Sequence, residues 1–142
     1  MAALDPVAAR RWCVGIAEMA TRREIERYGR PYLDRYELAG YTPGYSGPRI
    51  PSLYLHHFLA SDPREETHSH PWGWSASLIL AGGYREHRCT PDGAETIREL
   101  RPGDLNVIHA ADRHRVTLLG DECWTLFLAG RYAQPWHFDE AC

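Results

Sequence analysis

Two histidines separated by one residue, His68 and His70, are the clearest candidates for chemistry in this sequence. Side chains alternate between the two faces of an extended strand, so both imidazoles would point to the same side. Imidazole is the commonest side-chain ligand of metal ions in proteins. A third candidate, His114, lies in residues 112–116, where a second strand could return to the same place. These residues predict a metal site in a β-rich domain.

The ligand type limits the choice of metal without fixing it. Three neutral imidazoles on one face of an ion leave up to three open positions, which suits Fe(II) binding both O2 and a bidentate substrate. The same three ligands suit zinc with one open water position, as in hydrolytic sites. The residues alone leave Fe(II) and Zn open, with Ni or Mn as further alternatives.

The chain before residue 50 has a helical pattern followed by an irregular one. Asp5 is a good helix N-cap, and apolar residues recur at helical spacing through residues 5–29. Thr21 followed by Glu24 matches a capping box, which leaves open whether this stretch is one helix or two. Residues 32–51 mix four tyrosines with prolines and glycines. Such a composition is typical of an irregular arm that wraps the outside of a domain.

From residue 50 onward the pattern changes to short strands separated by turns. So many short strands at this spacing are typical of a closed or two-sheet β architecture rather than of a parallel α/β sheet. We therefore predict an all-β fold with an N-terminal helical extension. The predicted units are a helical segment with its arm, residues 1–48, and a β domain, residues 49–142. The predicted strands are residues 52–59, 75–81, 84–89, 95–100, 104–109, 114–119 and 122–129.

Composition excludes several classes of function. The formal net charge of −3 provides no basic field for nucleic acid. All sixteen lysine and arginine positions are arginine, so Schiff-base chemistry and a P-loop, which both need lysine, are excluded. No apolar run is long enough for a transmembrane helix. We expect a cytoplasmic protein that acts on a small molecule, with no nucleic-acid or membrane partner; pairing through edge strands into a homodimer stays open.

The cysteines give no structural signal. Cys13, Cys89, Cys123 and Cys142 are scattered and form no Cys-x-x-Cys pair. Neither a zinc knuckle nor a disulfide framework is therefore indicated. We expect all four thiols to be reduced.

Two motifs resemble those of the cupin superfamily. Residues 101–114 read Arg-Pro-Gly-Asp-Leu-Asn-Val-Ile-His-Ala-Ala-Asp-Arg-His. This is similar to the second cupin motif, in which a Pro-Gly-Asp turn and an apolar strand precede a ligand histidine. The first motif resembles His68-x-His70 with Gly82 twelve residues later. The resemblance covers about residues 50–130, and it implies a small jelly-roll (double-stranded β-helix) barrel with a metal bound in its mouth by His68, His70 and His114.

One position departs from the commonest cupin pattern. Ser75 stands five residues after His70, where cupins of the oxalate-oxidase type place a glutamate ligand. The three-histidine face that is left is similar to that of the thiol dioxygenases, the cysteine dioxygenase-like cupins. The Gly-x-x-x-Glu shape of residues 82–86 is similar to that group as well. Arg49 precedes the first strand of the β domain, much as the carboxylate-binding arginine does in thiol dioxygenases.

Three functions remain as hypotheses. The resemblance implies an Fe(II)-dependent dioxygenase or oxygenase of a small thiol or carboxylate, and it makes Fe(II) the favoured metal. In that reading Arg49 binds the anionic group, Ser75 leaves room beside the metal and Tyr84 is a candidate acid. The second hypothesis is a non-catalytic cupin that binds a ligand and whose metal is structural. The third, a metal-dependent isomerase or lyase, lacks an obvious Glu or Lys base. Fold alone does not choose among them.

Other histidines and the tryptophans have both structural and functional interpretations. His56 and His57 point to opposite faces of one strand, so at most one enters the barrel. His109 is placed on a turn, where solvent exposure and contact with a ligand are both open. Tryptophans could form an apolar wall for a ligand or plug the barrel ends. The tryptophans in question are Trp72, Trp74, Trp124 and Trp136.

Overall fold

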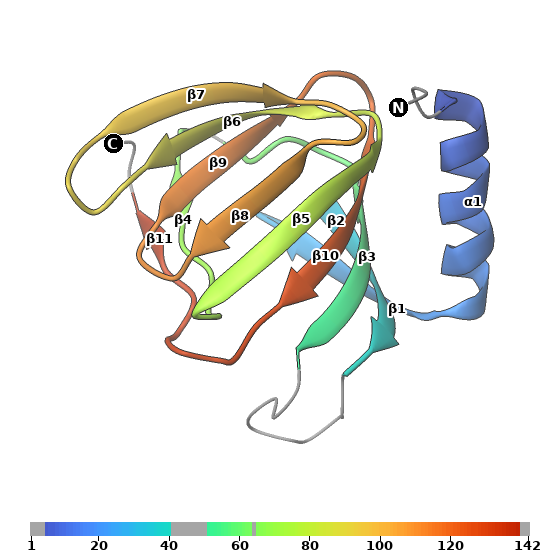
Figure 1. The fold of residues 1–142 in the computed structure, drawn as a ribbon, viewed down its shortest axis with the longest axis horizontal. Helices are drawn as coiled ribbons and strands as arrows, with labels where there is room; N and C mark the ends of the chain where they lie inside the picture. The colour runs from blue at the N-terminus through green and yellow to red at the C-terminus, as the bar shows by residue number, and fades with distance from the viewer. Residues whose placement is uncertain (1–4, 41–50, 64, 140–142) are drawn as a thin grey trace.

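The computed structural model describes residues 5–40, 51–63 and 65–139 as one helix and eleven strands in two antiparallel sheets (Figure 1). The helix α1 spans Pro6–Met19. The larger sheet has the strand order β1-β2-β3-β10-β5-β8, and the smaller has the order β11-β4-β9-β6-β7. The predicted all-β fold with an N-terminal helix is confirmed. The strands are β1 (Thr21–Arg27), β2 (Arg30–Ala39), β3 (Ser52–Phe58), β4 (Thr67–His68), β5 (Trp74–Ala81), β6 (Tyr84–Cys89), β7 (Glu95–Leu100), β8 (Leu105–His109), β9 (Arg113–Leu118), β10 (Cys123–Ala129) and β11 (Phe138–Asp139).

The core lies between the two sheets. Along β5 every second side chain from Ser75 to Ala81 is buried, as expected of a strand with one inward face. The main cluster joins both sheets, because Ile79 and Cys123 of the larger sheet pack against residues of the smaller one. Those residues of the smaller sheet are Tyr84, Leu100 and Val116. The two sheets therefore close on each other as a barrel.

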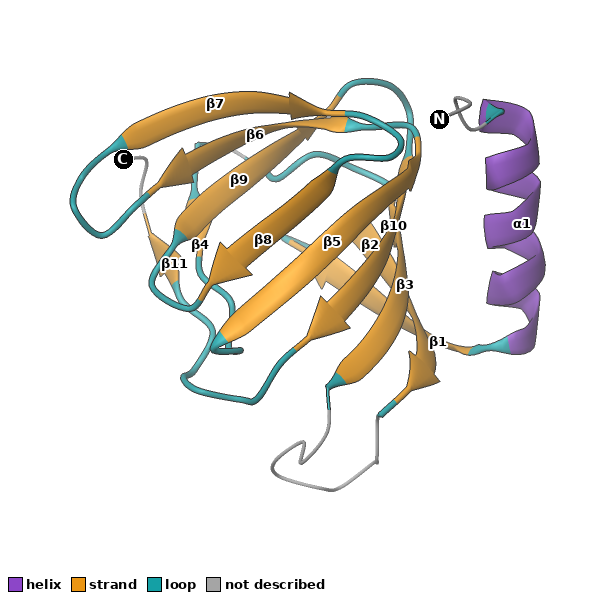
Figure 2. Ribbon diagram, viewed as in Figure 1, coloured by secondary structure: helices purple, strands orange, loops and turns teal. Residues whose placement is uncertain are grey.

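The helix α1 covers the outer face of the larger sheet (Figure 2). The Asp5 side chain accepts a hydrogen bond from the backbone N–H of Val7 at 3.1 Å, which caps the helix as predicted. Cys13 and Ala17 are its buried residues, and they pack with Trp124 of β10 and neighbouring apolar side chains. Within the described ranges, no helix combines the length and the apolar character that a membrane crossing requires.

Residues 21–29 are not helical, so this part of the prediction was wrong. β1 pairs with β2 through a two-residue turn at Tyr28 and Gly29, whose φ angles are 53° and 69°. Two successive residues with positive φ form the turn that matches the twist of antiparallel strands. The arginines and glutamates of β1 have good helix propensity, but pairing with β2 outweighs it.

The arm predicted as irregular is in part a strand. β2 pairs with β3 and so belongs to the same sheet as the strands of the β domain. Residues 41–50 lie outside the described residues. The division of the chain at residue 49 stays a prediction.

The cysteines differ from the expectation in one respect. Cys13 and Cys123 are free thiols, and burial raises the pKa of Cys13 to about 11 and that of Cys123 to about 12. Both therefore stay protonated and unreactive at neutral pH. Cys89 is disulfide-bonded, which corrects the expectation of four reduced thiols. A disulfide need not leave a local spacing pattern, so the sequence could not show it.

Gly82, in the turn between β5 and β6, has a backbone that only glycine fits. Its φ is +75°, and a Cβ there would lie 2.2 Å from the carbonyl oxygen of Glu122. Gly93 provides a matched control, with φ +85° and nothing within 4 Å of its Cβ position. Gly82→Ala is expected to lower the free energy of unfolding by more than about 3 kcal/mol, and Gly93→Ala by about 1 kcal/mol. Urea denaturation measures both; equal losses would contradict the clash.

Candidate metal centre

The structure brings together the three histidines that the sequence singled out. His68 on β4 lies directly opposite His114 on β9 in the strand ladder, and His70 follows β4 by two residues. All three side chains are buried, and each offers one ring nitrogen within 4.8 Å of the other two. The Nε2 atoms of His70 and His114 are 2.9 Å apart. Three imidazoles from neighbouring segments thus converge inside the barrel.

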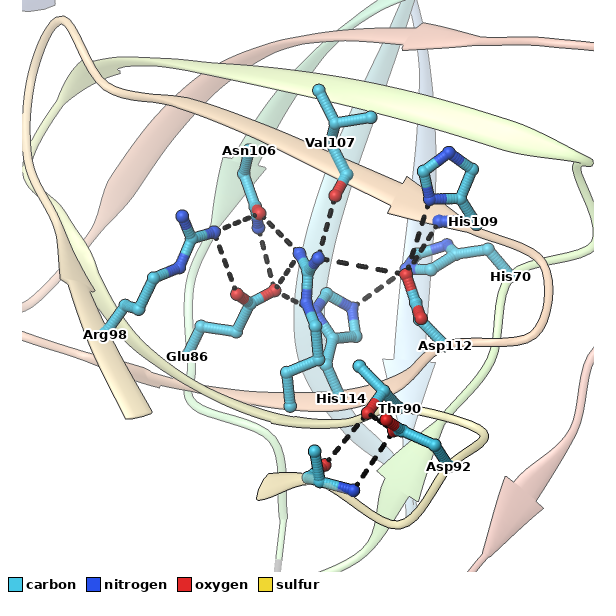
Figure 3. Close-up of polar contacts among 12 residues, drawn as sticks. His70, Glu86, Thr90, Asp92, Arg98, Asn106, Val107, His109, Asp112 and His114 are labelled. Atoms are coloured by element: carbon cyan, nitrogen blue, oxygen red, sulfur yellow. Dashed lines mark hydrogen bonds and ion pairs between the residues drawn. The ribbon is translucent and has the colours of Figure 1, made fainter. Parts of the chain in front are cut away.

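Glu86 on β6 fixes the tautomer of His114 (Figure 3). Its Oε1 lies 2.7 Å from His114 Nδ1, and the side chain is fully buried. Burial alone would raise the pKa of Glu86, but hydrogen bonds from His114 and Asn106 and the charge of Arg88 outweigh it and hold that pKa well below its usual range. An ionised carboxylate only accepts hydrogen bonds, so His114 Nδ1 donates and Nε2 keeps its lone pair for an ion.

Strand register brings Glu86 within reach of His114. In the β6–β9 ladder Arg88 lies opposite His114, and Glu86, two residues earlier, shares its face. Asn106 on β8 donates to Glu86 Oε1 at 2.8 Å and accepts from Arg98 of β7 at 2.7 Å (Figure 3). It also accepts from Arg88 at 2.6 Å. The carboxylate behind His114 is therefore held by side chains from four strands.

A second carboxylate, Asp62, lies behind His68. Its Oδ1 is 3.7 Å from His68 Nδ1. The same oxygen accepts hydrogen bonds from Tyr32 and Arg27, each at 2.7 Å. Asp62 thus lies on the Nδ1 side of His68, which leaves Nε2 of that ring for an ion.

His70 is held by packing and by a backbone contact. Its ring centroid lies 5.9 Å from those of Trp72 and Phe127 and 5.3 Å from that of Trp136. Gln134 donates to the His70 carbonyl oxygen at 3.0 Å. Burial, followed by the neighbouring histidines, lowers the pKa of His70 well below its usual value, so the ring is neutral at neutral pH. Neutral imidazole is the form that binds a metal.

The donor set fits a divalent transition-metal ion. Metal–imidazole bonds are about 2.0–2.1 Å long, so two ligands at a right angle around an ion lie about 3.0 Å apart. The Nε2 atoms of His70 and His114, at 2.9 Å, have this spacing. Three imidazoles with no carboxylate among them favour a first-row transition metal over Mg²⁺ or Ca²⁺, which prefer oxygen ligands.

Two neighbouring cavities adjoin the histidines. The inner cavity, of about 50 Å³, is lined by all three of them, and no Asp or Glu of the described ranges borders it. The outer cavity, of about 370 Å³, is bordered by His68, by Arg23 and by aromatic side chains such as Phe138. The residues that border both cavities are Tyr32, Leu33, Arg35, His68 and Trp136. The outer cavity therefore offers a small molecule an approach to the histidines.

The structure gives a different result for each of the three residues predicted beside the metal. Arg49 lies outside the described residues. Ser75 is fully buried on β5 and does not border the inner cavity, which Ser77, two residues further on, does. Tyr84 borders that cavity, but its hydroxyl accepts a hydrogen bond from Asn106 at 3.0 Å, and burial raises its pKa further above the usual value. The phenol is thus neutral and engaged, and the catalytic roles of all three stay predictions.

Of the three remaining candidate histidines, one borders the inner cavity and two lie away from it. His56 borders the inner cavity, whereas His57 lies on the other face of β3, stacked on Trp124 at 3.8 Å. His57 also contacts Glu122, with 2.6 Å between Nε2 and Oε2. The side chain of His109 is 69% exposed, so it belongs to the surface rather than to the site.

Two of the four tryptophans belong to the site. Trp72 and Trp136 border the outer cavity, and Trp136 borders the inner one too. Trp124 packs beneath α1, and Trp74 is partly exposed. Two of the four tryptophans therefore border a cavity beside the histidines, and the other two do not.

Three residues that build the site were not identified from the sequence. Glu86 had a weak signal, because it ends the Gly-x-x-x-Glu shape of residues 82–86. Asp62 lies in the loop between β3 and β4, and Arg35 lies in a stretch predicted to be irregular. Neither carries a local signal, because only the pairing of distant segments brings them to the histidines.

No protein-family model and no curated protein matches this sequence. Solved structures match it in fold. A structure of Fe(II)-HppE with the alternative substrate (S)-1-HPP superposes with a TM-score of 0.60 at 11% identity, over 80% of this chain and 57% of that one. Streptomyces albus HEPD with 2-hydroxyethylphosphonate and Fe(II) bound gives a TM-score of 0.60 at 16% identity, over 80% of this chain and 24% of that one.

An oxalate decarboxylase variant from Bacillus subtilis gives a TM-score of 0.61 at 15% identity, over 84% of this chain and 29% of that one. This chain thus spans 57% or less of the length of these three proteins. At such identities the likeness shows the fold, and the jelly-roll barrel predicted from the two motifs is confirmed: the chain has the cupin fold.

Proposed function

We propose that this protein is a mononuclear metal-dependent enzyme, an Fe(II) oxygenase of a small molecule, with His68, His70 and His114 as the metal ligands. The observation that carries the proposal is the convergence of three buried imidazoles at a cavity inside the barrel. Two of the proteins with the same fold, HppE and HEPD, are Fe(II) proteins, and the substrate bound to HEPD is the small compound 2-hydroxyethylphosphonate.

The lining of the inner cavity favours redox chemistry over acid–base chemistry. An isomerase or lyase needs a general base beside its substrate. Among the described residues no Asp or Glu borders the inner cavity, and the chain contains no lysine. His56 is the one histidine there besides the three ligands, and its Nε2 accepts a hydrogen bond from Arg35 at 3.1 Å. Fe(II), when bound, would supply the activation of O2 that a protein side chain cannot.

The chain's own residues position the histidines and line the cavity beside them with apolar side chains. Glu86 orients His114, and Asp62 lies behind His68, so two of the three rings have a carboxylate on the side away from the cavity. Trp136 and Phe127 pack on His70 and close the apolar side of the cavity. An apolar, pre-formed cavity of this kind limits the contact of a bound substrate with bulk water.

Metal analysis and oxygen uptake test the proposal. Protein purified without oxygen is expected to hold about one iron per chain, as one three-histidine site implies. Adding 2-hydroxyethylphosphonate, oxalate or cysteine, in separate trials, is expected to start O2 consumption with at least one of them. Protein that retains zinc, takes up no oxygen with any of these compounds and returns the bound compound unchanged would instead support a non-catalytic, ligand-binding cupin.

A further inference from the structure

Arg35, on β2, borders both the inner and the outer cavity. Its side chain is buried, with 9% of the residue exposed. It therefore lies between the approach from solvent and the three histidines. No other arginine of the described ranges borders the inner cavity.

In the part of the chain that the structure describes, Arg35 forms no ion pair with an Asp or Glu side chain, and Glu37 acts on its charge only as a minor, non-contacting influence. Two half-buried arginines of the barrel do form such a pair: Arg27 pairs with Asp62 at 2.7 Å, and Arg88 pairs with Glu86 at 3.0 Å. Arg35 instead donates from Nε to a neutral acceptor, His56 Nε2, at 3.1 Å. Burial lowers the pKa of Arg35 to about 10, so the guanidinium is still charged at neutral pH. A buried charge without a partner is costly, and a bound anion would offset that cost.

The unused donors of Arg35 have the geometry that an oxyanion needs. Its hydrogen bond to His56 uses Nε only, and the guanidinium lies over the rings of Tyr54 at 4.8 Å and Trp72 at 5.6 Å. The aromatic faces hold the group in place and leave the two terminal nitrogens to bind. A planar guanidinium held in this way binds a carboxylate or a phosphonate through two parallel hydrogen bonds.

The outer cavity supplies the rest of the ligand site. Trp72 and Trp136 line it beside Arg35, with ring centroids 5.9 Å apart, and its volume is about 370 Å³. Cavities of roughly this size hold small organic ligands. We infer that Arg35 binds the anionic group of a small organic carboxylate or phosphonate whose apolar body lies against Trp72 and Trp136. The inference deepens the proposed function and rests on it in one respect: this anion is taken to be the compound presented to the metal.

Ligand binding to the full chain tests the inference, both as purified and after removal of metal with a chelator. The probes are phenylacetate, benzylphosphonate and the neutral isostere phenylacetamide, followed by calorimetry. At least one of the two acids is expected to bind saturably, and the amide at least about tenfold more weakly. Whichever acid binds more tightly shows whether the site prefers a planar or a tetrahedral oxyanion.

Two variants distinguish specific binding by Arg35 from a general effect of the positive charge around the cavity. Arg35→Met keeps the length and apolar stem of the side chain and is expected to weaken binding of the acid at least about tenfold. Arg23→Met is the matched control, because Arg23 borders the same cavity but is exposed. Its effect is expected to stay within about threefold and to fade with added salt.

Three results would overturn the inference. They are equal binding of the acid and the amide by the unaltered protein, unchanged affinity in Arg35→Met, and no saturable binding of either acid up to about 10 mM. Should Arg35→Met fail to fold, the acid–amide comparison on the unaltered chain decides alone. If the protein holds no iron and takes up no oxygen but still binds the acid through Arg35, the proposed function is wrong and the anion site remains supported.

Discussion

His114→Ala is expected to lower the affinity of the protein for a divalent metal by more than about 100-fold. Loss of a residue that merely orients a ligand costs about 10–100-fold, and loss of the ligand itself must cost more. His114 is also the ring whose lone pair is best defined, because Glu86 accepts from its Nδ1 at 2.7 Å. Competition with a chromophoric chelator, with Co(II) or Zn(II) as the probe ion, measures the affinity.

His109→Ala is the matched control for this change. His109 lies five residues before His114 in the same β8–β9 segment, but its side chain is 69% exposed. Its removal is expected to leave the metal affinity unchanged. The experiment therefore separates the loss of a ligand from any general effect of removing an imidazole from this turn.

A second variant, His70→Ala, keeps the test decisive if His114→Ala changes the folding of the protein. His114→Ala leaves Glu86 without one of its hydrogen-bond partners in the core, which costs stability as well as metal. His70→Ala carries a smaller risk, because His70 Nδ1 has no hydrogen-bond partner among the described atoms. If both variants fold and still bind one ion per chain as tightly as the unaltered protein, the three histidines are not the ligands.

The β domain was largely predictable because its signals are local. The strands predicted from residue 52 to residue 129 agree with β3 and β5 to β10 to within one residue at each end. Turn residues such as Gly82 and Gly93, both at positive φ, mark the ends of those strands in the sequence. Between those turns, the alternation of apolar and polar side chains identified the strands themselves.

The strands that the sequence did not predict depend on partners. β1 is rich in arginine and glutamate and becomes a strand because β2 lies beside it. β4 is two residues long and exists because His68 pairs with His114 and with Phe138 of β11. Elements this short, or with this composition, have no period of their own to detect.

The residues of the site, like the strands, fall into those with a local sequence signal and those without one. His68, His70 and His114 could be singled out because two of them have the i, i+2 spacing that puts side chains on one face of an extended segment, and the third ends a recognisable motif. Glu86 and Arg35 could not be placed, because their roles arise from strand register and burial. A carboxylate or a guanidinium in the sequence has the same appearance whether it lies at the surface or beside a metal site.

Glu86→Ala is expected to lower the free energy of unfolding by about 3–5 kcal/mol, because removing one partner of a buried ion pair leaves the other charge uncompensated. Glu86 accepts from Asn106 at 2.8 Å and from Arg88 at 3.0 Å, and Arg98 lies 3.3 Å from its second oxygen. Glu99→Ala is the matched control, since Glu99 also binds two arginines, at 2.9 Å each, but in solvent.

Glu99→Ala is expected to lower the free energy of unfolding by less than about 1 kcal/mol, because its ion pairs are exposed to solvent. Urea denaturation of the metal-free proteins compares the two variants without a contribution from the ion. Glu86→Gln then separates stability from orientation: it keeps the shape of the side chain but no longer presents an ionised acceptor to His114 Nδ1. Its metal affinity is expected to fall about 10–100-fold. A Glu86→Gln protein that binds metal normally would mean that His114 keeps its tautomer without the carboxylate, and Glu86 would then contribute to stability alone.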